Sequence, residues 1–363
     1  MKEVQDMPPL VSVIVPTYNR RWVLEKCLRS LLAQTCSPQL YEIIVIDDGS
    51  TDGTRDMVAQ LVGEWGDARP VATQPEAEAG PSADSGARAH AVACPLVYRY
   101  QDHACAAAAR NAGIKLSRGT LVIFLDSDIV TKPDFIAAHM REHLKGAASP
   151  AADVPRAGSD AAAALCDSRV IVHGRVIYTT NLDSPTREPR KVSDISTAFF
   201  ATTNVSIARR WLIEAGLFDE DFTEYGWEDL ELGKRLKKLG LRVVRSEAPA
   251  GYHLKREFRT EDLPAIKRRE IERGRMAIVY VKKHPTFSVR MTTLTVAPFI
   301  WLVSILGAGG WPDRPVAVRV LERLRRRGHR ALLGVVLQIM VYYWYVQGIK
   351  EASARQGGSG VGL

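Results

Sequence analysis

Short apolar runs alternate with helix-forming segments through the first third of the chain. Four runs of five residues are rich in β-branched and other large apolar residues: 11–15, 42–46, 96–100 and 121–125. Apolar residues recur at helical spacing in the segments between them, as in 21–35 and 105–116. Strands that are apolar on both faces and alternate with helices are typical of a parallel sheet covered on its two sides. We therefore expect an α/β fold that binds its ligands at the carboxyl ends of the strands.

Two stretches interrupt this alternation. Residues 66–95 and 146–166 are rich in Ala, Pro, Gly, Ser and Asp and lack hydrophobic periodicity. We expect both to form mobile insertions. Further strands are predicted at 169–178 and 241–245, with helices near 208–215 and 227–239.

The chain is expected to divide into three regions. These are a main domain over 1–260, a basic and apolar helical region over 261–355, and a disordered tail over 356–363. The five cysteines are odd in number, scattered and without a C-x-x-C pair. This pattern argues against a zinc site or a disulfide framework and fits a reducing compartment. The start, MKEVQDMPPL, has no apolar stretch, so no secretory signal is expected.

The fourth apolar run ends abruptly in two carboxylates, Asp126 and Asp128. Residues i and i+2 of a strand point to the same side, so the two side chains would repel each other without a cation between them. Oxygen ligands of this kind suit Mg²⁺ or Mn²⁺, which substrate phosphates commonly share. The alternative is a polar loop that happens to contain two aspartates.

Two further groups of polar residues accompany these strands. Asp47-Asp48-Gly49-Ser50 follows the second strand, where a carboxylate can accept a hydrogen bond from a base or a ribose. Because Asp, Gly and Ser are the usual turn residues, a turn with a helix cap is the alternative. Arg110 lies on the helix before the fourth strand and could hold a phosphate, or it could be a surface arginine.

A helix start at Gly226-Trp227-Glu228-Asp229 suits a sugar site. The Trp227 ring can pack on the apolar face of a pyranose, and a carboxylate can take a hydroxyl proton. The alternative is that the acids complement the helix dipole while Trp227 belongs to the core. His253 follows a later strand and could complete a metal site, although a lone histidine is more often structural.

Five segments, in their order along the chain, resemble the signatures of family 2 glycosyltransferases of the GT-A fold. They are VSVIVPTYNR (11–20), VIDDGSTDGT (45–54), AARNAGI (108–114), FLDSD (124–128) and GWEDLELGKRL (226–236). The resemblance covers about residues 10–255 and is specific as a set. The last segment also resembles the carboxyl-terminal half shared with galactosyltransferase-like domains. The resemblance implies a Rossmann-like, mostly parallel sheet flanked by helices.

The resemblance also implies a nucleotide-sugar donor, with UDP as the expected nucleotide and Asp48 on the uracil. The donor-side residues would be Pro16, Tyr18, Asp48, Arg110, Asp126 and Ser127, and the metal ligands Asp128 and His253 with Mn²⁺ or Mg²⁺. At the acceptor, Asp229 would be the general base, with Glu228 beside it and Trp227 in contact with the sugar. The segment 101–105 departs from the family pattern, because it has Ala and Cys where glycine is usual.

Such a site predicts a metal-dependent inverting transfer to a glycan or lipid-linked acceptor in the synthesis of cell-surface polysaccharide. A single displacement needs no carboxylate nucleophile, unlike a double displacement. One alternative is a processive polysaccharide synthase, which usually carries a Q-x-x-R-W motif that this chain lacks. Another is a non-catalytic scaffold that binds nucleotide sugars.

The carboxyl-terminal third combines positive charge with apolar runs. Residues 264–330 hold 15 Lys and Arg against four Asp and Glu, and they lie among apolar runs at 291–311 and 331–349. If both runs spanned a bilayer, one of two basic flanks would violate the positive-inside bias. We therefore expect a peripheral or monotopic hairpin on the cytoplasmic face of the cell membrane, with its arginines at anionic headgroups.

The apolar runs leave other partners to consider. A soluble helical subdomain or a homo-oligomer interface is the alternative to membrane association. Nucleic acid is not an expected partner, because the basic segment is bracketed by apolar runs.

Overall fold

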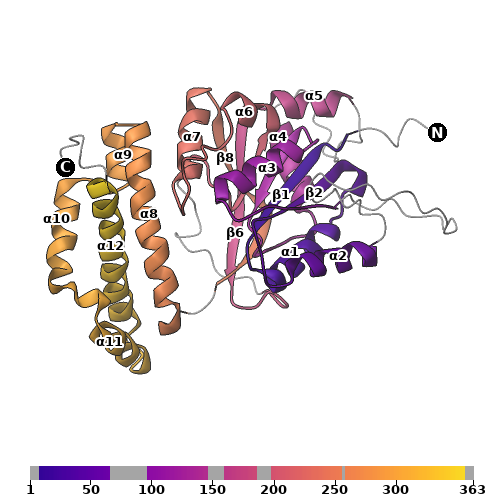
Figure 1. The fold of residues 1–363 in the computed structure, drawn as a ribbon. Helices are drawn as coiled ribbons and strands as arrows, with labels where there is room; N and C mark the ends of the chain where they lie inside the picture. The colour runs from indigo at the N-terminus through magenta and orange to yellow at the C-terminus, as the bar shows by residue number, and fades with distance from the viewer. Residues whose placement is uncertain (1–7, 66–95, 146–158, 186–197, 256–257, 356–363) are drawn as a thin grey trace. The chain divides into compact units, whose positions relative to one another are not determined.

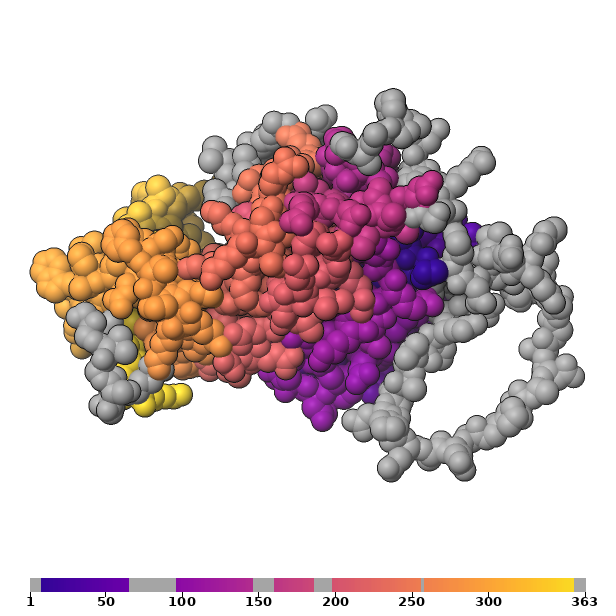
Figure 2. Space-filling view, turned by 90° about the horizontal axis from the view of Figure 1, so that it is seen from above, coloured from indigo at the N-terminus to yellow at the C-terminus, as the bar shows by residue number. Residues whose placement is uncertain are grey.

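The computed structural model describes residues 8–65, 96–145, 159–185, 198–255 and 258–355, which are coloured along the chain in Figures 1 and 2. They form two compact units. The first comprises Met1–Asp219 and Leu232–Lys255, and the second comprises Glu220–Glu231 and Arg256–Leu363. The insertion expected over 66–95 and the tail over 356–363 lie outside the described residues.

The first unit is built on an eight-stranded sheet (Figure 1). In chain order its strands are β1 (Val11–Thr17), β2 (Tyr41–Asp47), β3 (Leu96–Tyr100), β4 (Leu121–Leu125), β5 (Ile129–Thr131), β6 (Val170–Thr179), β7 (Asn204–Ala208) and β8 (Arg242–Leu254). Their order in the sheet is β3-β2-β1-β4-β7-β6-β8-β5. The neighbouring strands from β3 through β2 and β1 to β4 pair parallel, as do β6 and β8. β7 pairs antiparallel with both β4 and β6, and β5 pairs antiparallel with β8. The expected mostly parallel α/β sheet is confirmed.

Helices cover both faces of this sheet, because alternate residues of each strand point to opposite sides. The helices of the first unit are α1 (Arg21–Leu32), α2 (Thr54–Trp65), α3 (Ala106–Leu116), α4 (Phe135–Leu144), α5 (Ser159–Asp167) and α6 (Arg209–Glu214). Val13 and Ile123 face the core formed with α1, α2, α4 and α5. Ile14 and Val122 face the other core, which contains residues of α3 and α6.

The helix α5 corrects one sequence prediction. Residues 146–166 were expected to form a mobile insertion, but α5 runs through its last part, and Leu165 is fully buried in the core under the sheet. Ala, Asp and Ser dominate this segment, so its apolar face is too narrow to show as a periodic pattern. Residues 146–158 lie outside the described part of the chain.

A buried polar network lies inside the first unit, between α4 and the strands β6 and β7. Ser206 Oγ is 2.8 Å from His139 Nδ1 and 2.9 Å from His143 Nε2. His139 Nε2 lies 3.0 Å from the side-chain oxygen of Asn204, which pairs with Leu125 at the end of β4. Burial lowers the pKa of His139 to about 4 and that of His143 to about 3. Both imidazoles are therefore neutral in the folded protein at neutral pH.

The second unit is helical. Its helices are α8 (Leu263–Lys283), α9 (Phe287–Thr292), α10 (Ala297–Leu306), α11 (Pro315–Arg326) and α12 (Arg330–Arg355). The helix α7 (Glu228–Lys238) begins among residues of the second unit and ends among those of the first. The cores of the second unit gather around Tyr280 with Tyr345 and around Leu321 with Trp344. The apolar run at 291–311 is not one straight helix, since α9 and α10 are separate and Gly309 and Gly310 adopt positive φ angles.

Two segments of the second unit are long and apolar enough to cross a membrane by length and composition. They are Phe287–Leu306 and Arg330–Arg355, and 22% and 33% of their most apolar windows are buried within the protein. Core helices of soluble proteins are mostly buried, so these segments expose more apolar surface than that explanation predicts.

Candidate active site

The first part of the site lies where β1 and β2 end side by side. The pairing of Thr17 with Asp47 continues in a hydrogen bond from the Asp48 amide to the Thr17 carbonyl at 3.0 Å. The two loops that follow are joined again, because the Asn19 amide donates to Ser50 Oγ at 2.8 Å. Tyr18 and Asp48 are thereby fixed on neighbouring strand ends. Pro16 lies just inside the end of β1, opposite Ile46.

The neighbouring Asp47 has a structural role. One of its carboxylate oxygens accepts from the Ser50 amide at 2.8 Å, and the other accepts from the Tyr98 hydroxyl at 2.6 Å. Sequence analysis gave a turn as the alternative role for Asp47 and Asp48, and Asp47 is the residue that forms this turn. Asp48, one residue later, is directed to other partners.

Asp48 is bound by the segment that leads into α3. Its Oδ1 accepts from Gln101 Nε2 at 2.6 Å and from the Ala104 amide at 3.1 Å. Its Oδ2 lies 2.9 Å from Nδ1 of His103, and the same imidazole stacks on the ring of Tyr18 with centroids 4.2 Å apart. The sequence identified 101–105 as a departure from the family pattern, and the structure brings this segment into direct contact with two predicted nucleotide-binding residues.

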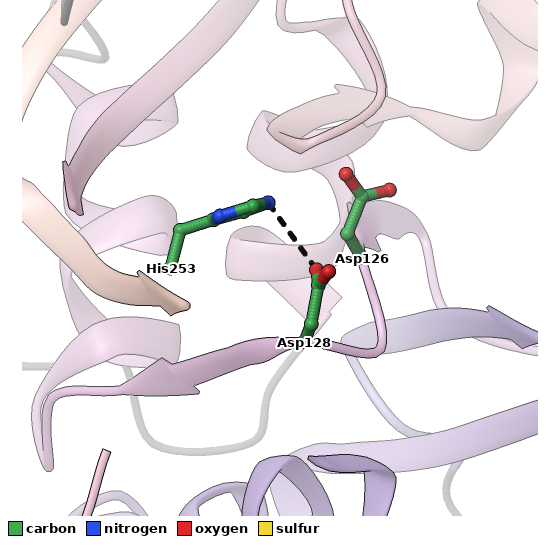
Figure 3. A group of neighbouring side chains, drawn as sticks. All are labelled: Asp126, Asp128 and His253. Atoms are coloured by element: carbon green, nitrogen blue, oxygen red, sulfur yellow. Dashed lines mark ion pairs between the residues drawn. The ribbon is translucent and has the colours of Figure 1, made fainter. Parts of the chain in front are cut away.

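The second part of the site is the D-x-D pair at the end of β4 (Figure 3). β4 ends at Leu125, so the two aspartates lie in the turn between β4 and β5 rather than along a strand. The Asp126 amide donates to the Thr203 carbonyl at 3.1 Å, and the Ile129 amide donates to the Asp126 carbonyl at 3.2 Å. These two hydrogen bonds fix the backbone of the turn, and the carboxylates of Asp126 and Asp128 lie close to each other.

His253 reaches the same place through the sheet. β5 pairs antiparallel with β8, and Ile129, the residue after Asp128, lies opposite His253. His253 Nε2 is 3.3 Å from Asp128 Oδ1, the contact drawn as a dashed line in Figure 3. One ligand atom from each of Asp126, Asp128 and His253 lies within 4.8 Å of the others. The structure thus brings the two predicted metal ligands, Asp128 and His253, together with Asp126, the other member of the D-x-D pair.

The groups around Asp126 have opposite effects on its pKa. Burial and then the nearby Asp128 carboxylate raise the pKa of Asp126, while the positive charges of Arg110, His253 and Arg20 lower it. The Arg20 guanidinium forms an ion pair with Asp128. Two carboxylates in a partly buried turn are costly unless cationic groups compensate them. Arg110 is itself buried, 5.5 Å above the ring of Phe218.

The donor set fits a hard divalent cation. Two carboxylates with one imidazole are ligands that Mn²⁺ accepts, and Mg²⁺ also binds to carboxylates of this kind. Within the part of the chain that the structure describes, Asp128 Oδ1 and His253 Nδ1 are buried without a hydrogen-bond partner, and Oδ1 is the atom that faces the imidazole. Buried polar atoms without a partner are uncommon in proteins, and here they belong to the residues that could ligate an ion.

The predicted acceptor residues belong to the second unit. Trp227 is 8% exposed, its Nε1 donates to the Arg273 carbonyl at 2.8 Å, and its ring stacks on Tyr280. Glu228 is buried and Asp229 is half-buried, at the first residues of α7. Burial raises the pKa of Tyr280 to about 12, with Glu231 and Asp229 adding to the effect. The acceptor roles of Trp227, Glu228 and Asp229 stay predictions.

Two residues of the site were not singled out from the sequence. Arg20 was part of the VPTYNR segment, but nothing in the pattern connects it to Asp128, which is 108 positions later. His103 lies in a segment noted only for its missing glycine. The missed contacts of Arg20 and His103 join different loops, which hydrophobic periodicity does not predict.

Ser127, which was predicted at the donor side, lies between the two aspartates and is buried in their turn.

The chain is similar to known proteins over most of its length. It is 26% identical over 296 residues to validoxylamine A glucosyltransferase of Streptomyces hygroscopicus subsp. limoneus, covering 77% of this chain and 57% of that protein. It is 27% identical over 264 residues to hyaluronan synthase of Pasteurella multocida, covering 67% of this chain and 24% of that protein. The chain thus spans little more than half the length of the first relative and about a quarter of the second.

A solved structure also aligns with the chain. The mannosyltransferase PcManGT from Pyrobaculum calidifontis, in complex with GDP-Man and Mn²⁺, aligns with 96% of this chain and 87% of its own, at a TM-score of 0.49 and 16% identity. The model of the family described as glycosyl transferase family 2 matches residues 12–83 and 94–214, which include Tyr18, Asp48, Arg110 and the D-x-D pair. The chain belongs to glycosyl transferase family 2.

Proposed function

We propose that this protein is a metal-dependent inverting glycosyltransferase that uses a nucleotide-sugar donor, with UDP as its nucleotide. The observation that carries the proposal is the convergence of Asp126, Asp128 and His253 in one group at the end of β4. The strand ends that carry Tyr18 and Asp48 belong to the same sheet, because β1 lies between β2 and β4. Ligands of open α/β sheets bind at such carboxyl ends.

The donor side follows from this arrangement. Tyr18 and Asp48 bind the base, Pro16 borders it, and Arg110 binds near the nucleotide, where its charge favours phosphate. Asp126 and Ser127 lie at the ribose, and Asp128 with His253 would hold Mn²⁺ or Mg²⁺. When bound, such an ion would neutralise charge on the leaving diphosphate.

The chemistry at the acceptor is assigned to the first turn of α7. Asp229 removes the proton from the acceptor hydroxyl, whose oxygen forms a bond to the anomeric carbon. The bond from that carbon to the diphosphate oxygen breaks in the same step, so the configuration is inverted. Glu228 lies beside the base, and Trp227 and Glu228 are assigned to the acceptor, a glycan or a lipid-linked glycan precursor of the cell surface.

Donor turnover tests the proposal directly. Purified protein is given UDP- and GDP-sugars with Mn²⁺ or Mg²⁺, with and without membrane lipids, and nucleotide release is measured. Release from a UDP-sugar that EDTA abolishes is the expected result. Release that persists in EDTA would refute the metal dependence, and release from GDP-sugars alone would refute the UDP assignment.

The general base is tested separately. Asp229→Asn should abolish transfer and leave UDP binding nearly unchanged, because the carboxylate acts only on the acceptor. Asp221→Asn is the control, since Asp221 is an exposed carboxylate of the same unit with 73% of its side chain accessible. Loss of UDP binding in Asp229→Asn, or transfer equal to that of the control, would contradict the role of a base.

We also propose that the second unit binds the cytoplasmic face of the cell membrane. Trp301, Leu302 and Ile305 of α10 are 67%, 50% and 50% exposed, and Leu332 and Val335 of α12 are exposed as well. Apolar surface of this extent is typical of an interaction face. Its charge fits an anionic bilayer, because residues 312–330 carry seven arginines.

Flotation with lipid vesicles tests the membrane proposal. We expect the protein to float with vesicles that contain an anionic lipid and to stay behind with purely zwitterionic vesicles at physiological salt. Equal flotation with both kinds would refute the role given to the arginines. No flotation with either would favour a soluble helical unit or a homo-oligomer interface.

A further inference from the structure

The imidazole of His103 lies between two groups assigned to the nucleobase. It is stacked on Tyr18 with an angle of 20° between the ring planes, and its Nδ1 is 2.9 Å from Asp48 Oδ2. A flat ring on an aromatic face, with a ring nitrogen directed at a carboxylate, is what a pyrimidine base with a ring N–H would present at the same place. The protein therefore fills these contacts with one of its own side chains.

The backbone leaves little room for a different path of this segment. Gly49 has a φ angle of +89°, and a Cβ atom there would lie 2.9 Å from the Cβ and the amide nitrogen of His103. Position 49 must therefore remain without a side chain for the segment to pass. The close approach fixes the backbone of residue 103 beside Asp48, while the side chain beyond Cβ stays free to rotate.

The imidazole can leave without disturbing Asp48. The His103 side chain is 56% exposed, so its rotation into solvent uncovers no core. Asp48 Oδ1 keeps its hydrogen bonds from Gln101 and the Ala104 amide. The atoms that lose His103 Nδ1 as a partner are Oδ2 and the backbone carbonyl oxygen of Asp48, each 2.9 Å from it. A carboxylate that stays in position with one oxygen released is prepared for a new N–H donor.

We propose that His103 is an internal occupant of the nucleobase site, whose imidazole must leave Tyr18 and Asp48 before the donor nucleotide binds. The proposal rests on the proposed donor site and adds a competitor to it. It also defines the bases that can replace the imidazole, because uracil and guanine carry a ring N–H for Asp48 whereas cytosine and adenine do not. The intramolecular contact lowers donor affinity, and the Asp48 carboxylate disfavours bases that lack a ring N–H.

Binding of nucleotides to His103→Ala tests the proposal. UDP, GDP, CDP and ADP are titrated by calorimetry in the presence of Mn²⁺ into wild type, His103→Ala and the neighbouring control Asp102→Ala. We expect the Kd of UDP to fall about tenfold in His103→Ala, which corresponds to about 1.4 kcal/mol, and to be unchanged in Asp102→Ala. CDP and ADP should bind weakly to all three proteins.

A spectroscopic readout distinguishes displacement from a general effect. The ring-proton resonances of His103, identified by their absence in His103→Ala, should lose the ring-current shift caused by Tyr18 when UDP saturates the wild-type protein. Equal or weaker UDP binding by His103→Ala, or an unchanged His103 resonance, would overturn the inference and leave the proposed function intact. Absence of UDP and GDP binding in every variant would overturn the donor assignment itself, and the inference with it.

Discussion

Acid should destabilise the first unit through the buried histidines His139 and His143. Burial and nearby histidines lower the pKa of His139 from 6.5 to about 4 and that of His143 from 6.5 to about 3. The unfolded chain takes up protons on both imidazoles as the pH falls through 6.5, while the folded protein does not. Stability is therefore fully present above this value and is lost progressively as the pH falls toward 4 and then 3.

The magnitude follows from the two pKa values of each group. At pH 5 an unfolded histidine is almost entirely protonated and the folded one is almost entirely neutral, so each contributes about 2 kcal/mol of lost stability. Among the neighbouring groups, Glu142 raises the pKa of His139 and His173 lowers it, while Arg245 lowers the pKa of His173. The two histidines together should cost about 4 kcal/mol, which is a large part of the stability of a typical domain.

Amide hydrogen exchange of β4 and β7, together with urea unfolding, measures this loss between pH 8 and pH 5. His143→Gln keeps a polar side chain toward Ser206 but cannot titrate, so it should remove about half of the pH dependence. The control His329→Gln changes an exposed histidine and should leave the dependence unchanged. A wild-type stability that is flat from pH 7 to pH 5, or a full slope in His143→Gln, would refute the reasoning.

Three further changes test other parts of the structure. Asp128→Asn should weaken Mn²⁺ binding by at least about tenfold in a calorimetric titration, while Asp134→Asn, which alters an exposed carboxylate, should not. Gly113→Ala places a Cβ 2.5 Å from Ile14 Cγ2 and should destabilise the protein by about 1 to 3 kcal/mol in urea. Gly63→Ala on α2 places a Cβ with no atom of the described residues within 4 Å, and it should stabilise the protein by up to about 1 kcal/mol. Replacing exposed arginines 319 and 323 with Glu should abolish flotation with anionic vesicles, and unchanged flotation would count against electrostatic attachment.

The sheet could be predicted because its strands carry their own pattern. The four predicted strands from 11–15 to 121–125 are β1 to β4, with one or two residues added at some ends. β5 could not be predicted, since it has only three residues and exists through its pairing with β8. The antiparallel position of β7 between β4 and β6 likewise depends on contacts between distant segments, and periodicity within a strand does not reveal them.

The carboxylates of the site were easier to predict than their surroundings. Asp126, Asp128 and Asp48 follow strands with clear hydrophobic signals, so their position at the ends of the sheet could be deduced from the strands alone. The mutual arrangement of His253 and Asp128 could not, because it is set by the register between β5 and β8. The acidic pair was expected along a strand, but it lies in a turn held by the Thr203 carbonyl.

The contacts of Arg20 and His103 have one physical feature in common. Each is a cationic or hydrogen-bonding side chain on a loop, and each binds a carboxylate to which the proposed function assigns a ligand of its own: Arg20 at Asp128 and His103 at Asp48. Carboxylates held in a site without such partners would be costly, so loop side chains can stabilise them until the ligand arrives. Because both side chains are about half exposed, exchanging them for a metal or a base requires only rotation into solvent. Under the proposed function, loop side chains would therefore influence donor affinity through their contacts in the unliganded site as well as through their contacts with the bound donor.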